Sequence, residues 1–305
     1  MNRVNVEPEH LPVMLEETLQ CLAPQPGETM LDGTLGLGGH AVEIFRALMP
    51  GGILVGIDRD PQALERASAR LDGVGGEYRL LHGTFDAMGQ LLQEAGLGSD
   101  GALDGLLLDL GVSSMQLDRA ERGFSFRNDG PLDMRMDPGA GESAASWLAG
   151  VPVEELSRVI RRYGEDPQSG RIARGIDRYR QERRIETTGQ LSSLIEELVP
   201  RRGKKIHPAT RTFQAIRIVI NGELDCLREA LERLDRYMKP GGRVVVLSYH
   251  SLEDRLVKEA FRQRVKEGLF LAHPAGLLRP SATEVSSNPR SRSARLRAVV
   301  RPGGR

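Results

Sequence analysis

The sequence predicts an α/β fold: a doubly wound parallel sheet into which an all-α domain is inserted. Short apolar strands alternate with amphipathic helices through the first 110 residues. The alternation then stops for about ninety residues that show only helical patterns, and a strong strand returns at 243–248. These observations place a sheet domain at 1–115 and 211–305, interrupted by a helical substrate-recognition domain at 116–210.

The first strand, turn and helix predict a nucleoside pocket. Asp32 follows a strand that ends at Leu31, and the second strand, 53–57, ends in Asp58. Between the two strands lies a turn with three glycines, Gly36, Gly38 and Gly39. Glycine lets a ligand approach the backbone closely, and a carboxylate at a strand end accepts hydrogen bonds from a ribose diol. The alternative is a glycine turn that joins strand to helix without any ligand.

Two further strands end beside candidate ligand contacts. The strand at 78–82 is followed by Phe85, whose ring could stack on an adenine, with packing in the core as the alternative. The strand at 103–110 ends at Asp109, the third carboxylate at a strand end. Because ligands of doubly wound sheets lie beyond the carboxyl ends of the strands, these residues belong to the same predicted pocket.

Helical spacing of apolar residues predicts the remaining helices. They are expected at 10–22, 61–71, 143–149, 153–163, 170–182, 188–199 and 210–238, the last with a break near Asn221 and Gly222. After the strand at 243–248, Ser251 and Asp254 resemble a capping box, and His250 could be structural or could face the site. A final strand at 296–300 is expected to pair at the sheet edge.

The formal net charge of zero conceals an asymmetry between the two parts of the chain. Residues 1–110 carry 17 acidic and 6 basic side chains, whereas the remaining 195 residues carry 25 acidic and 36 basic ones. A basic part joined to an acidic nucleoside-binding part predicts a polyanionic partner, most simply nucleic acid. Two cysteines exclude a disulfide framework or a cysteine-rich metal site, and we expect a reducing cytoplasm without membrane association.

The excess of basic residues is concentrated in three segments. Residues 158–184 hold nine arginines and four acids, 201–222 hold six basic residues and no acid, and the tail from Arg279 holds seven arginines and one acid. Arginine at this density suits phosphate recognition, and the alternative is an ordinary solvated helix face.

Several long motifs together resemble a known family. The pattern Asp32-x-x-x-Gly36-x-Gly38 differs from a dinucleotide fingerprint and resembles the first motif of class I S-adenosylmethionine-dependent methyltransferases. Nine stretches, at 10–17, 32–40, 58–64, 106–118, 122–126, 130–137, 207–218, 248–255 and 288–294, resemble the bacterial ribosomal RNA small subunit methyltransferase H family, also called MraW. Tyr249 departs from the pattern, in which Phe is expected, and the linker between Phe270 and Ser286 is short.

The resemblance implies a class I methyltransferase fold and N4-methylation of a cytidine in the decoding region of small-subunit (16S) ribosomal RNA. It implies S-adenosyl-L-methionine as methyl donor and the small ribosomal subunit as partner, with no DNA, membrane or required metal. The implied cofactor contacts are Gly38, Gly39, His40, Asp58, Phe85, Asp109 and Gln116. Of these, His40 and Gln116 come from the resemblance alone.

Methyl transfer to an exocyclic amine needs a group that accepts the amine proton, because the N4 lone pair is delocalised into the ring. Asp109, at the tip of the fourth strand, is our hypothesis for that catalytic role, with pure cofactor binding as its alternative. Other functions also remain: a DNA or other RNA amino-methyltransferase, or a non-catalytic RNA-binding assembly factor. A nucleotide-dependent oxidoreductase is disfavoured because the pyrophosphate fingerprint is missing.

Overall fold

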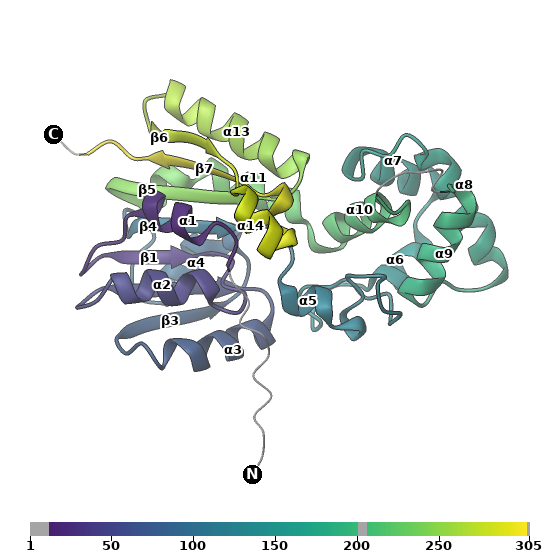
Figure 1. Ribbon diagram of the computed structural model, residues 1–305, viewed down its shortest axis with the longest axis horizontal. Helices are drawn as coiled ribbons and strands as arrows, with labels where there is room; N and C mark the ends of the chain where they lie inside the picture. Colours follow the sequence, from purple (N-terminus) through teal and green to yellow (C-terminus); the bar gives the residue numbers. More distant parts are fainter. Residues whose placement is uncertain (1–11, 201–205, 304–305) are drawn as a thin grey trace, which may run out of the picture. The chain divides into compact units, whose positions relative to one another are not determined.

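The computed structural model describes residues 12–200 and 206–303. It divides into two compact units, one of residues 1–111 and 225–305 and one of residues 112–224 (Figure 1). We call them the sheet unit and the helical unit. The division differs from the predicted boundaries because α10 (Ala209–Asn221), expected in the sheet domain, places Phe213 and Ile216 in the core of the helical unit. The predicted doubly wound fold with an inserted all-α part is confirmed.

Seven strands form the single sheet of the sheet unit. They are β1 (Thr29–Asp32), β2 (Ile53–Asp58), β3 (Glu77–His82), β4 (Leu103–Asp109), β5 (Met238–Ser248), β6 (Leu271–Leu278) and β7 (Arg295–Val300), in the spatial order β3-β2-β1-β4-β5-β7-β6 (Figure 1). The first five in this order run parallel, and β7 pairs antiparallel with both β5 and β6. In β4, Leu106, Leu107 and Leu108 are all fully buried, as expected where both faces of a parallel sheet are covered.

Helices cover both faces of this sheet. The elements of the sheet unit outside the strands are α1 (Leu15–Leu22), α2 (Gly39–Ala47), α3 (Pro61–Leu71), η1 (Phe85–Ala87), α4 (Met88–Glu94), α11 (Glu223–Glu232), α12 (Leu234–Tyr237), α13 (Ser251–Lys266), α14 (Ala282–Ser287) and η3 (Pro289–Ser293). One hydrophobic cluster joins the sheet to α4, α11 and α13, and the other joins it to α1, α2 and α3. Asp60 caps α3 by accepting the backbone N–H of Gln62, as its position before Pro61 predicts.

The tail strand β7 is not the edge strand that the sequence predicts. It lies between β5 and β6, because it is covered on both faces: Leu296 packs in one hydrophobic cluster and Val299 in the other. The edge is β6, which the sequence analysis missed because Pro274 and Gly276 interrupt it and most of its side chains are exposed.

The structure corrects the predicted start of one helix and confirms the predicted end of another. The box that caps α13 is formed by His250 and Glu253 instead of Ser251 and Asp254, so the helix begins one residue earlier than the predicted cap implies. The predicted break after Asn221 is confirmed, since Gly222 ends α10 with a φ of +58°, a conformation that favours glycine.

The helical unit contains α5 (Ser114–Asp118), η2 (Ala120–Arg122), α6 (Ala144–Gly150), α7 (Val153–Tyr163), α8 (Ser169–Glu182), α9 (Thr188–Leu198) and α10. The predicted bounds of α6 to α9 agree with the structure to within one residue at each end. Apolar residues of α6 to α10 form one core, in which the rings of Phe126 and Phe213 lie 4.8 Å apart. In the described part of the chain, every helix is too short or too polar to cross a membrane.

Because β7 is an interior strand, its buried side chains should matter far more for stability than those of β6. We expect Leu296→Ala to lower the free energy of unfolding of the sheet unit by about 3 kcal/mol, since a fully buried leucine is truncated. Leu271→Ala is the matched control: Leu271 lies on β6, is 57% exposed and should cost less than about 0.5 kcal/mol. Chemical denaturation measures both, and equal losses would contradict the interior position of β7.

Candidate cofactor-binding and active site

Three carboxylates lie at the carboxyl ends of three neighbouring parallel strands. Asp32 ends β1, Asp58 ends β2 and Asp109 ends β4, and β1 lies between the other two strands. The strand register brings their ends to the same edge of the sheet. The structure therefore gathers in one place the three acids that the sequence analysis selected.

Burial sets the ionisation of this cluster. It raises the pKa of Asp32 to about 7, with the charges of Asp109 and Asp58 adding to the rise and His40 opposing it. It also raises the pKa of Asp109 to about 7, although the Tyr249 hydrogen bond opposes the shift. The pKa of Asp58 is raised by burial too, against hydrogen bonds from two backbone N–H groups. A cluster of carboxylates that is costly to ionise favours a positively charged ligand, which would offset the loss of solvation.

The glycine turn is held by one of these acids. Oδ2 of Asp58 accepts the backbone N–H of Gly36 at 2.7 Å, and Oδ1 accepts that of Asp60 at 2.8 Å. Each carboxylate oxygen has a second lone pair, so Asp58 can still accept hydrogen bonds from the hydroxyls of a ribose.

The glycines themselves are explained by backbone shape and packing. Gly36 and Gly38 have φ of +51° and +75°, and Gly38 is the N-cap of α2. A Cβ atom at Gly39 would lie 3.1 Å from Cγ of Pro12. The alternative in which the turn only joins strand to helix thus accounts for the glycines, and the acidic cluster is the feature that points to a ligand.

A chain of polar contacts runs through Asp109 from Val13, which precedes α1, to Tyr249, which follows β5. Nε2 of His40 lies 3.0 Å from the carbonyl oxygen of Val13, and because a carbonyl only accepts, this nitrogen carries the proton. Burial lowers the pKa of His40, so its other nitrogen, Nδ1, keeps a lone pair, and it lies 3.5 Å from Oδ2 of Asp109. The hydroxyl of Tyr249 donates to Oδ1 of Asp109 at 2.7 Å. A proton on Asp109 would therefore face a histidine nitrogen able to accept it.

Sequence reasoning missed two members of this site. The hydroxyl of Thr34 accepts the backbone N–H of Asp109 at 2.6 Å and lies 3.4 Å from Oδ1 of Asp32, so it connects the ends of β1 and β4. Its position two residues after Asp32 was the available signal, since Asp side chains often bond the backbone two residues on. Tyr249 was noticed only as a departure from the family pattern, and its hydrogen bond to Asp109 depends on the pairing of β4 with β5.

The remaining predicted residues have other surroundings. Phe85 begins η1, is 9% exposed and packs in the hydrophobic cluster with Leu31 and Leu108. Gln116 belongs to the helical unit, where it completes a capping box by accepting the backbone N–H of Ser113 at 3.1 Å. Their contacts with a cofactor remain predictions.

His250, which the sequence left ambiguous, has a structural role. Its Nδ1 accepts the backbone N–H of Glu253 at 3.3 Å and so caps α13, while Nε2 lies 3.0 Å from Oε1 of the same glutamate. These contacts account for a histidine at the strand end without any catalytic role.

Comparison with known proteins identifies the family. The family described as the MraW methylase family matches residues 7–301. Proteins named ribosomal RNA small subunit methyltransferase H from Syntrophotalea carbinolica and Trichlorobacter lovleyi are 48% and 46% identical to this chain; each alignment covers 96% of this chain and 98% of the relative. The protein of the same name from Thioalkalivibrio sulfidiphilus is 46% identical over 96% of this chain and 98% of its own length. The chain therefore belongs to the MraW methylase family.

Proposed function

We propose that this protein transfers a methyl group from S-adenosyl-L-methionine to N4 of a cytidine in the decoding region of small-subunit ribosomal RNA, acting in the cytoplasm on the small ribosomal subunit. The names of its relatives support the RNA substrate. The observation that carries the chemistry is Asp109, a half-buried carboxylate with a raised pKa at the end of β4, contacted by both His40 and Tyr249.

The acidic cluster suits the proposed cofactor. S-adenosyl-L-methionine supplies a methyl group on a positively charged sulfonium, which is a good leaving group. Asp58 offers carboxylate oxygens for the ribose, and the turn at Gly38 and Gly39 is where a ligand would meet the backbone. Asp32 is 2% exposed and contributes negative charge to the pocket without direct access to solvent.

Asp109 is the group best placed to take the amine proton. Its side chain is 25% exposed, so one substrate atom can reach it. Accepting a hydrogen bond from the N4 amine would raise electron density on the nitrogen, and a pKa near 7 lets the carboxylate take the proton as the new bond forms. His40 then faces the protonated oxygen through its Nδ1 lone pair.

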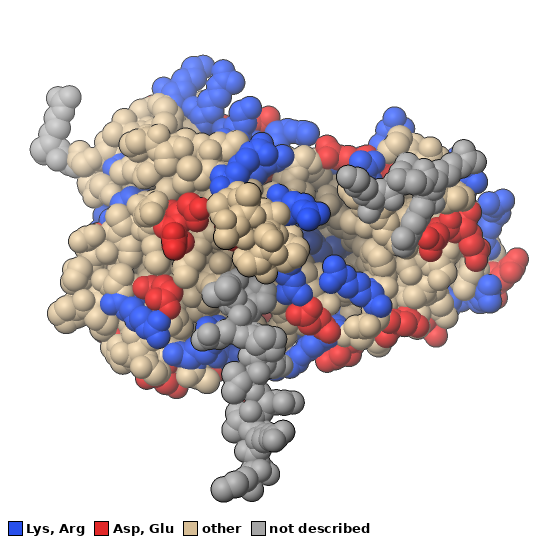
Figure 2. Space-filling model, in the orientation of Figure 1, with Lys and Arg blue, Asp and Glu red and all other residues tan. Residues whose placement is uncertain are grey.

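The arginines of the helical unit fall into two classes. Some are structural: Arg180 bonds Asp177 and the carbonyls of Leu148 and Val151. Others are exposed, and their side chains make no hydrogen bond or ion pair with another described residue; they are Arg161, Arg171, Arg174 and Arg178, on α7 and α8. The second class supports a role of this unit in gripping RNA phosphates. Figure 2 shows basic side chains on the face of the helical unit turned to the viewer. The segment 201–205 lies outside the described residues.

The product assay tests the proposed function as a whole. The purified protein would be incubated with methyl-labelled S-adenosylmethionine and, in parallel, unmethylated small subunits, naked ribosomal RNA and duplex DNA. We expect label in N4-methylcytidine from the subunit. Label in DNA would favour the alternative amino-methyltransferase, and cofactor binding without transfer to any RNA would favour the non-catalytic assembly factor.

Cofactor binding should depend on pH through the acidic cluster. Asp32 and Asp109 have pKa values of about 7 in the folded protein, so both gain protons as the pH falls below 7 and the cluster loses negative charge. We expect the affinity for S-adenosylmethionine to fall between about pH 8 and about pH 6, by up to tenfold per pH unit for each coupled proton. Isothermal titration calorimetry measures this.

S-adenosylhomocysteine is the matched control ligand, because it lacks the sulfonium charge and should lose less affinity over the same range. Asp32→Asn keeps an oxygen that can accept the Thr34 backbone N–H and removes the charge. We expect this variant to bind S-adenosylmethionine more weakly at about pH 8 and to depend less on pH. If the affinities for S-adenosylmethionine and S-adenosylhomocysteine fell equally with pH, the cluster would have no role in binding the positive charge.

Asp109→Asn distinguishes proton acceptance from cofactor binding. Loss of a general base typically lowers the rate by roughly 100-fold or more. We therefore expect turnover to fall at least that far, with the dissociation constant for S-adenosylmethionine changing by less than roughly tenfold. Single-turnover kinetics and equilibrium binding measure the two effects, and the opposite order of losses would assign Asp109 to cofactor binding alone.

Tyr249→Phe leaves Asp109 in place and removes only the phenol that bonds it. That hydrogen bond lowers the pKa of Asp109, so its loss should raise this pKa and move the rising limb of the pH–rate profile to higher pH. Turnover at high pH should stay near that of the unaltered protein. An unchanged pH profile would show that the rate does not depend on ionisation of Asp109.

A further inference from the structure

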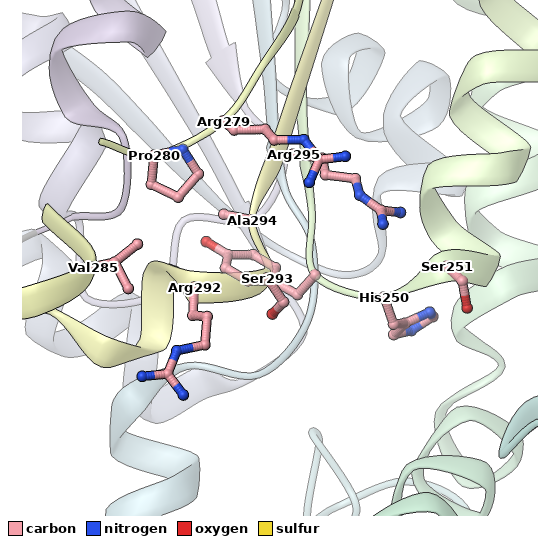
Figure 3. Close-up of a pocket in the computed structure, with 10 residues that line it drawn as sticks. His250, Ser251, Arg279, Pro280, Val285, Arg292, Ser293, Ala294 and Arg295 are labelled. Carbon is pink, nitrogen blue, oxygen red and sulfur yellow. The ribbon is translucent and has the colours of Figure 1, made fainter. Parts of the chain in front are cut away.

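The sheet unit contains a concave site whose lining includes none of Asp32, Asp58 and Asp109. It is a pocket of about 250 Å³ between the end of β5, the segment after β6, and α14 with η3 (Figure 3). Ten residues line it: Tyr249, His250, Ser251, Arg279, Pro280, Val285, Arg292, Ser293, Ala294 and Arg295. It draws on the arginine-rich tail, whose arginine density the sequence analysis linked to phosphate recognition, and it includes Arg292 and Ser293 of the Asn288–Ser293 stretch.

The lining of this pocket is basic on one part and apolar on another. Arg279, Arg292 and Arg295 contribute three guanidinium groups, and none of the described lining residues is an Asp or Glu. Pro280 and Val285 contribute apolar surface. The volume of this pocket is below the range of about 300 to 1,000 Å³ that is typical of pockets for drug-sized ligands. It therefore suits a single small chemical group that has an anionic part and an apolar part.

Two of the three arginines are available to a ligand. Arg279 and Arg292 are exposed, and within the described residues neither side chain has a hydrogen bond or ion pair. Arg295 is paired, since its Nη1 donates to Oδ2 of Asp254 at 3.0 Å, while Oδ1 of the same carboxylate accepts from Nε of Arg297 at 2.8 Å. Asp254 is thus already paired with two arginines, and the lining of the pocket keeps a positive excess. Figure 2 shows basic side chains bordering the surface near α14.

The walls of the pocket are anchored on both sides. Arg279 directly follows β6, and Arg295 begins β7, so the sheet fixes both ends of the segment that carries the arginines. Within it, Ser281 caps α14, and Oε1 of Glu284 accepts the backbone N–H of Met14 at 2.7 Å. Such anchoring orders the loop before a ligand arrives, which lowers the entropy cost of binding.

Tyr249 connects this pocket to the proposed reaction centre. It lines the pocket, and its hydroxyl bonds Oδ1 of Asp109. A chemical group bound in the pocket would therefore lie next to a base that is bound at Asp109. In a nucleic acid, that neighbour is the next nucleotide along the strand.

We propose that this pocket binds the phosphodiester and ribose of the RNA nucleotide adjacent to the target cytidine, with Arg279 and Arg292 contacting the phosphate. Guanidinium groups match phosphate geometry, and Pro280 and Val285 provide surface for the sugar. Holding the neighbouring nucleotide positions a base that has left its stack. The adjacency to the target cytidine rests on the proposed function, whereas the phosphate contact does not.

The test is RNA binding by Arg279→Gln/Arg292→Gln over a salt series. The probe is a short fluorescein-labelled single-stranded RNA with one central cytidine, in the presence of S-adenosylhomocysteine. Each lost phosphate contact should lower the slope of log K against log salt by about 0.7, so the double variant should lose about 1.4. Its affinity at low salt should fall roughly tenfold or more.

Arg262→Gln is the matched control. Arg262 lies on α13 and is exposed, and its side chain has no hydrogen bond or ion pair in the described part of the chain, so this variant should keep both the slope and the affinity. Equal binding of S-adenosylhomocysteine by all variants verifies that each is folded. The KM for RNA should rise in the double variant while turnover at saturating RNA is retained.

The outcomes separate the two proposals. If the unaltered protein transfers methyl groups to RNA and the double variant keeps its slope, its affinity and its KM, the pocket proposal is overturned and the proposed function stands. If the double variant loses RNA affinity but the unaltered protein transfers no methyl group, the pocket remains an RNA site and the proposed function falls.

Discussion

The site depends on the burial of three carboxylates at the ends of adjacent parallel strands. The three carboxylates repel one another and lose solvation, and each is stabilised by polar contacts. Asp32 accepts a hydrogen bond from a threonine, Asp58 from two backbone N–H groups and Asp109 from a tyrosine. These contacts hold the glycine turn and join the ends of β1 and β4. These contacts do not fully offset the cost of ionising the three carboxylates. A positively charged ligand would lower that cost, which makes the cluster suited to a sulfonium cofactor.

Tyr249 connects the carboxyl-terminal strands to the site at Asp109. It follows β5, which pairs with β4 on one side and with β7 on the other. One side of this residue therefore reaches Asp109 and the other lines the pocket that is built from the tail. The pairing of β7 with β5 is needed for this arrangement, because it places Arg295 opposite Ser248 at the end of β5.

The arginines that cause the charge asymmetry of the chain have two different roles. Arg180 and Arg295 are used inside their own units to bond carboxylates, and Arg180 also bonds backbone carbonyls. Arginines whose side chains are exposed and have no partner among the described residues, such as Arg174 on α8 and Arg292 on η3, are those that can contact phosphates. Counting charges indicated a polyanionic partner, but only the contacts separate structural arginines from those open to a ligand.

By itself the sequence determined the alternating strands and helices, the inserted helices, the family and the three strand-end acids, because periodicity, turn residues and strand termini are local properties. The tertiary structure decided which distant residues meet. It placed β7 inside the sheet, assigned the cap of α13 to His250, and joined Tyr249 and Thr34 to Asp109. Strand order and side-chain partners depend on pairing between segments far apart in the chain, and that information is absent from any local pattern.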